Sequence, residues 1–90
     1  MAAVHLIIQG KVQGVFYRVS AKKTAASLSI IGWVRNTQEG HVEIIAQGEE
    51  EQLQQFINWC KRGPSTAQVE NVITEQAEEQ PFKEFKILHN

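Results

Sequence analysis

The stretch Gly10-Lys11-Val12-Gln13-Gly14-Val15-Phe16-Tyr17-Arg18 joins two segments of different periodicity. An apolar run typical of a β-strand, residues 4–9, precedes it, and a segment with helical spacing, residues 18–29, follows it. The two glycines suit a tight loop whose backbone N–H groups point inward. Because such a loop at a helix N-terminus binds anions through fixed partial charges, the stretch predicts a phosphate-binding turn between a strand and a helix.

The other elements follow from apolar spacing and turn residues. The second helix begins after Gly48 with three glutamates and ends at Lys61-Arg62, before Gly63-Pro64, so its charges complement the helix dipole. Strands are expected over residues 31–37, 41–47, 67–74 and 82–88, the third of them irregular because its apolar residues break strict alternation. The expected apolar stripes are Ala21, Ala25 and Leu28 in the first helix and Leu53, Phe56, Ile57 and Cys60 in the second.

This order predicts an α+β fold, a ferredoxin-like α/β sandwich with two helices on one face of a mostly antiparallel sheet. The arrangement is βαββαβ with an extra C-terminal strand. In this topology the first two strands run parallel with another strand between them. Their C-terminal ends, near Gly10 and Asn36, therefore lie at the same end of the sheet. Residues 1–90 are expected to form one domain, because the chain is too short for two independent cores.

Composition narrows the class of protein. The chain is 42% hydrophobic, which indicates a globular domain, and its single cysteine excludes an internal disulfide and favours the cytoplasm. The first apolar run is too short for a signal peptide or a membrane span. Residues 1–38 hold five basic side chains and no acid, whereas residues 39–90 hold all ten acids. The overall pI of about 6.3 argues against a general nucleic-acid-binding protein.

Arg18 stands where a helix normally disfavours a cation. A positive charge in the first turn opposes the dipole by about 0.3–1 kcal/mol, and no acid lies in residues 18–29 to offset it. A solvated arginine is the alternative explanation. Next to a glycine-rich loop, however, the planar guanidinium favours bidentate recognition of phosphate. Lys11, Lys22, Lys23 and Arg35 are interpreted as solvated charges with a minor steering role.

A second cluster, Gly32-Trp33-Val34-Arg35-Asn36 with Gly40, Val42 and Gly48, follows in the chain. Together the two stretches resemble the two signatures of the acylphosphatase family, and the resemblance covers essentially the whole chain. It implies that Arg18 holds the phosphoryl group and that Asn36 orients the attacking water. It also implies a phosphate cradle, the backbone N–H groups of residues 13–18, that is Gln13, Gly14, Val15, Phe16, Tyr17 and Arg18. The sequence departs from the family at Ser29, where a glycine is expected to end the first helix.

The reaction class follows from the side chains that the motifs lack. They contain no carboxylate, histidine, cysteine or metal-ligand set, so an alkyl phosphate, whose alkoxide needs help to leave, is a poor substrate. An acyl phosphate releases a carboxylate, whose conjugate acid has a pKa of roughly 4–5, and needs no general acid. We therefore expect a metal-independent acylphosphatase without a cofactor. Its partners are a small acyl phosphate as substrate and inorganic phosphate as product and inhibitor, with no nucleic acid or membrane, and the protein is expected to be a monomer.

Two alternatives belong to other functional classes. One is a non-catalytic anion-binding or regulatory domain of acylphosphatase-like fold. A separate chain of 90 residues that contains both Arg18 and Asn36 favours the enzyme over this alternative. The other is an RNA-binding module of similar topology. Such a module needs paired aromatic residues on a central strand, and residues 41–47 contain none.

Overall fold

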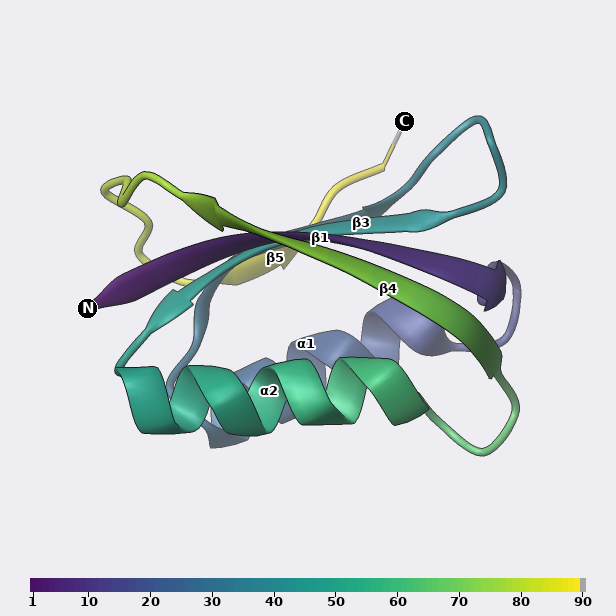
Figure 1. The fold of residues 1–90 in the computed structure, drawn as a ribbon, viewed down its shortest axis with the longest axis horizontal. Coiled ribbons are helices and arrows are strands. Elements are labelled where there is room, and N and C mark those ends of the chain that lie inside the picture. Colours follow the sequence, from purple (N-terminus) through teal and green to yellow (C-terminus); the bar gives the residue numbers. More distant parts are fainter. Residues whose placement is uncertain (90) are drawn as a thin grey trace.

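A computed structural model describes residues 1–89, in which two helices cover one face of a five-stranded sheet (Figure 1). Strands neighbour one another in the order β4-β1-β3-β2-β5. The predicted α+β, ferredoxin-like fold is confirmed, with Asn90 outside the described residues. The elements are β1 (Ala2–Lys11), α1 (Tyr17–Ser27), β2 (Ile31–Asn36), β3 (Val42–Gly48), α2 (Glu50–Arg62), β4 (Gln68–Ala77) and β5 (Phe85–Ile87).

Strand directions bring the two sequence motifs to the same edge of the sheet. β3 pairs antiparallel with both β1 and β2, so β1 and β2 run parallel on either side of it. In one row across the sheet, Ile8 of β1 and Asn36 of β2 both lie opposite Val42. The loop after β1 and the turn after β2 therefore leave the sheet at the same end, at the right in Figure 1. The added strand β5 pairs parallel with β2.

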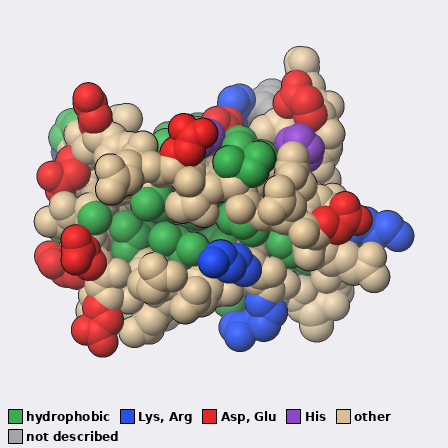
Figure 2. All heavy atoms as spheres, viewed as in Figure 1, with side chains coloured by type: hydrophobic (Ala, Val, Ile, Leu, Met, Phe, Trp, Pro, Cys, Tyr) green, Lys and Arg blue, Asp and Glu red, His purple; other side chains and the backbone are tan. Residues whose placement is uncertain are grey.

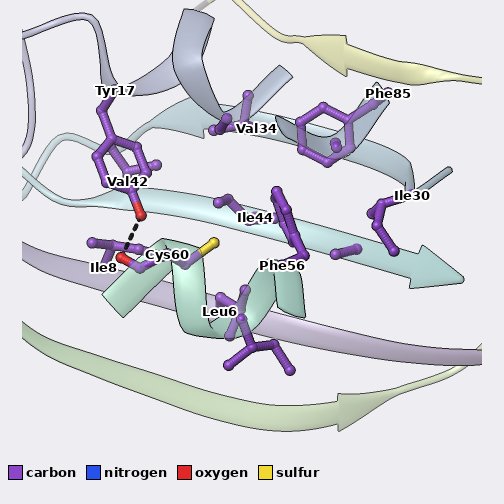
Figure 3. Packing of buried hydrophobic residues seen from close by; sticks show 14 of the residues in the cluster. Leu6, Ile8, Tyr17, Ile30, Val34, Val42, Ile44, Phe56, Cys60 and Phe85 are labelled. Atoms are coloured by element: carbon purple, nitrogen blue, oxygen red, sulfur yellow. Dashed lines mark hydrogen bonds between the residues drawn. The ribbon is translucent and has the colours of Figure 1, made fainter. Parts of the chain in front are cut away.

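The core lies between the sheet and the helices, with side chains from both contributing (Figure 3). All four stripe residues predicted for α2 are buried. In α1, Ala21 and Ala25 are buried as predicted, whereas Leu28 follows the helix and is only partly buried. At the heart of the core, the rings of Phe56 and Phe85 meet edge to face with centroids 5.6 Å apart.

α1 ends earlier than expected, at Ser27, and Ser29 has a φ of 57°. The N–H of Ile30 donates to the carbonyl of Ala25 at 2.8 Å, the hydrogen bond that closes a helix through a left-handed residue. The expectation of a glycine at this position is therefore explained, because Ser29 occupies the conformation that glycine adopts without steric cost.

The last two strands differ from their predicted bounds. β4 extends to Ala77 and contains a bulge: Gln9 lies opposite Asn71 and Gly10 opposite Val69, so Glu70 is the extra residue. The bulge explains the broken alternation, since it lets Val69 and Val72 both pack against the core. β5 is only three residues long and begins at Phe85. The segment before it lies outside the strand, and there the side chain of Gln47 donates to the carbonyl of Gln80 and accepts from its N–H.

Candidate functional site

The loop from β1 to α1 contains two residues in the left-handed region. Gly14 has a φ of 74° and Phe16 a φ of 64°, and Phe16 is also the N-cap of α1. Phe16 makes no side-chain capping hydrogen bond, and the first turn of α1 contains no acidic residue. Turns of this kind direct successive N–H groups into a concavity. The start of α1 therefore combines a backbone nest with the positive end of a helix dipole.

The two glycines of this motif have different roles. A Cβ atom on Gly10, which lies in β1, would stand 2.2 Å from the carbonyl oxygen of Gln68, so Gly10 permits the close approach of β4. A Cβ atom on Gly14 would meet nothing within 4 Å. Gly14 is therefore needed for its backbone conformation alone, whereas Gly10 lies outside the loop.

Side-chain hydrogen bonds hold the loop from two sides. Gln13 Nε2 donates to the carbonyl oxygens of Thr37 and His41, at 2.8 and 2.7 Å. On the other side, Thr66 Oγ1 donates to the carbonyl oxygen of Val15 at 2.6 Å. The bonds from Gln13 fasten the cradle to the turn that directly follows Asn36. The sequence motif includes Gln13, but nothing in its pattern indicated that the side chain would bridge two loops.

Tyr17 anchors the start of α1 to the end of α2. Its hydroxyl donates to the carbonyl oxygen of Cys60 at 2.7 Å (Figure 3). Its ring centroid lies 5.3 Å from that of Trp59. Burial raises the pKa of Tyr17 far above its usual value, and burial raises the pKa of Cys60 to about 12. Both groups are therefore neutral at physiological pH, and their role is packing rather than proton transfer.

This contact places the basic end of α2 beside the start of α1. Lys61 and Arg62 occupy the last turn of α2, whereas Glu50 and Glu51 occupy its first turn. In Figure 2, acidic side chains gather at the left end of the molecule, where α2 begins, and the basic ones lie at its middle and right, beside a few acidic ones. The basic last turn of α2 therefore lies near the start of α1, where its positive charge favours the approach of an anion.

Arg18 lies in the first turn of α1 and Asn36 at the end of β2, so both are at the same end of the sheet. Arg18 is half-buried and lines a hollow of about 230 Å³, which also includes Gly14, Phe16 and Tyr17 from the cradle. Asn36 is the last residue of β2, and its side-chain oxygen Oδ1 is buried. By strand alternation it shares the helix-facing side of the sheet with Val34. Asn36 is not among the residues that line the hollow.

Arg35 points to the opposite face of the sheet, where its side chain is 40% exposed but is also paired with Glu43, which its assignment as a solvated charge did not include. Its Nε donates to Glu43 Oε1 at 2.6 Å, and its guanidinium lies 5.8 Å from the ring centroid of Trp33. His5 Nε2 is 2.6 Å from the other oxygen of Glu43. Burial alone would raise the pKa of Glu43, but the hydrogen bonds from His5 and Arg35 outweigh it and lower that pKa. This network stiffens the pairing of β2 with β3 next to Asn36.

The described residues also bear on metal binding and on membrane insertion. Within residues 1–89, no group of three or more histidine, cysteine or acidic side chains is arranged to hold a metal ion. Neither helix in this part of the chain has the length and apolar character needed to cross a membrane.

Comparisons with known proteins agree with this geometry. The acylphosphatase family model matches residues 4–87. An acylphosphatase of Methylococcus capsulatus is 42% identical over 91 residues, which cover 100% of this chain and 99% of the relative. The crystal structure of acylphosphatase from Bacillus subtilis has a TM-score of 0.95 at 31% identity and covers 99% of this chain and 100% of that one. Full-length HypF, solved in a phosphate- and nucleotide-bound form, has a TM-score of 0.86 at 27% identity and matches 98% of this chain but only 12% of its own. The chain belongs to the acylphosphatase family.

Proposed function

We propose that this protein hydrolyses the carboxyl–phosphate bond of acyl phosphates, with Arg18 and the cradle holding the phosphoryl group and Asn36 orienting the attacking water. Family membership supports the reaction. The observation that supports the site is the start of α1, where two left-handed residues, an uncapped N-terminus and Arg18 come together without any acid in the first turn.

The chemistry needs positioning and charge stabilisation more than acid–base groups. The water oxygen forms a bond to phosphorus while the bond from phosphorus to the acyl oxygen breaks, and the electron pair leaves with the carboxylate. A dianionic acyl phosphate and water thus become a carboxylate and dihydrogen phosphate. Phosphoryl transfer of this kind passes through a loose transition state, which fixed N–H groups and a guanidinium stabilise. A carboxylate leaves without protonation, so Arg18, the cradle and Asn36 suffice without a metal ion.

Several further properties belong to the same proposal. Inorganic phosphate binds the cradle as product and competitive inhibitor. The protein acts as a monomer in the cytoplasm and binds no nucleic acid. The single cysteine, which cannot form an internal disulfide, supports the cytoplasm, and the net charge of −1 supports the absence of nucleic-acid binding.

The alternative is a non-catalytic anion-binding domain. The match to 12% of full-length HypF supports this alternative, because there a domain of the same fold is part of a larger protein. Turnover separates the two. We expect benzoyl phosphate and acetyl phosphate to be hydrolysed, each at the same rate with a chelator as without it. A simple alkyl phosphate should be hydrolysed far more slowly. Phosphate binding without any turnover would favour the non-catalytic domain. Activity that chelator removes and a divalent ion restores would overturn the metal-free mechanism.

A further inference from the structure

Two large apolar side chains are exposed on either side of Arg18. Phe16 is 72% exposed and Val19 is 45% exposed, although both lie at the start of a helix that packs on the core. Exposed apolar residues scattered singly need no explanation, but apolar residues that gather at a binding site indicate an apolar ligand group. These two are next to the residue proposed to hold the phosphoryl group.

The hollow at this site has a polar side and an apolar side. Gly14 and Arg18 contribute to the polar side, and Val12, Phe16, Val19 and Ile87 contribute apolar side chains. Ile87 comes from β5, and the next residue, Leu88, is held there because its N–H donates to the carbonyl oxygen of Val34 at 2.8 Å. Phe16 and Val19 at the start of α1 and Ile87 in β5 thus form one apolar wall of the hollow.

The size of the hollow suits a small organic group. An apolar cavity of about 150 Å³ is enough to hold benzene, and this hollow measures about 230 Å³. Among the residues that line it, Arg18 and His89 have basic side chains, and none is an aspartate or a glutamate. With Arg18 engaged by the phosphoryl group, most of the remaining surface can offer only apolar contact.

We propose that this wall binds the acyl group, and that the substrates are acyl phosphates with an aliphatic or aromatic acyl group of several carbons. The inference rests on the proposed function, because the phosphoryl group must lie at Arg18 for the acyl group to reach Val19 and Ile87. Binding energy from the acyl group then adds to the contacts of the cradle.

The test compares acetyl, butyryl and hexanoyl phosphate. Their carboxylate leaving groups are nearly equal in acidity, so differences in kcat/KM report on contact with the acyl chain. We expect kcat/KM to rise by up to about fourfold for each methylene that is buried, from about 0.8 kcal/mol per methylene. Val19→Thr, which keeps the shape of the side chain but makes it polar, should lower the hexanoyl-to-acetyl ratio about threefold or more.

Ile73→Thr is the matched control, because Ile73 is 43% exposed on β4, away from the hollow. It should leave the ratio at the wild-type value. Equal kcat/KM for all three substrates, or equal ratios in the two variants, would overturn the acyl-binding wall while leaving the hydrolase intact. If no substrate is hydrolysed, the proposed function fails. Binding of methyl- and hexylphosphonate then tests the wall by itself, since equal Kd values for the two would refute it.

Discussion

The two helices of this protein use their N-termini in opposite ways. α2 has Glu50 and Glu51 in its first turn and Lys61 and Arg62 in its last, which complements its dipole. α1 has no acid in its first turn and no base in its last, and its N-cap, Phe16, is in the left-handed region. The charges of α2 stabilise that helix, whereas the absence of an acid at the start of α1 supports the proposal that its positive end binds an anion.

The largest effect on kcat/KM is expected at Arg18, a base in the first turn of α1, where α2 has two glutamates. Arg18→Lys should lower kcat/KM by about 10²–10³, because an ammonium group cannot reproduce the bidentate fork. Steady-state kinetics with acetyl phosphate measures it. Arg62→Lys, in the last turn of α2, is the control and should be close to wild type. Near wild-type kinetics for Arg18→Lys would remove the bidentate role.

Asn36 separates catalysis from phosphate binding. Asn36→Ala should lower kcat by about 10²-fold or more while changing the Kd for phosphate little, since its proposed role is to orient the water. Kinetics and calorimetric titration of phosphate together test this. The control is Asn58→Ala on α2, where the side chain accepts a hydrogen bond from Gln54 on the surface. A large rise in the Kd for phosphate would instead place Asn36 among the phosphate ligands.

Gln13 tests whether the nest at α1 depends on its attachment to the β2–β3 turn. Gln13→Ala removes the hydrogen bonds to the carbonyls of Thr37 and His41. The expected cost is about 1–3 kcal/mol in unfolding free energy, with kcat/KM about tenfold lower. Urea denaturation and kinetics measure the two effects. Gln54→Ala, which removes an exposed bond within α2, serves as the control. Full activity in a destabilised Gln13→Ala protein would show that the bridge serves folding alone.

The smallest effect is the stabilisation of the folded state by phosphate. At ten times its Kd, phosphate should stabilise the protein by about 1.4 kcal/mol and raise Tm by roughly 5–10 °C. Arg18→Ala should lose most of this shift, while its stability without phosphate stays level or rises by at most about 1 kcal/mol. Calorimetry across a phosphate titration, with chloride matched for ionic strength, measures both. An equal shift in the two proteins would move the anion site away from α1.

Local patterns accounted for the elements with clear boundaries. The periodicity and end residues of α2 depend on neighbours within a turn or two, so its start, its end and all four buried stripe residues were predictable. The glycine expected at Ser29 came from the family resemblance, and the φ of 57° there is a conformation that glycine adopts without steric cost. β5 was predicted too long because the apolar spacing of residues 82–88 does not show which of them pair with β2, and only Phe85–Ile87 do.

The sequence by itself therefore determined the order of the elements, the two motifs and the candidate residues Arg18 and Asn36, since these depend on residue type and short-range spacing. Only the tertiary structure decided how the motifs are held. Gln13 lies 24 residues from Thr37 and 28 from His41, and Thr66 lies 51 from Val15. The same is true of Ile87 beside Val19 and of Arg35 paired with Glu43. Such contacts arise from strand register and from helix packing on the sheet, and these bring together residues whose separation along the chain leaves no periodic trace.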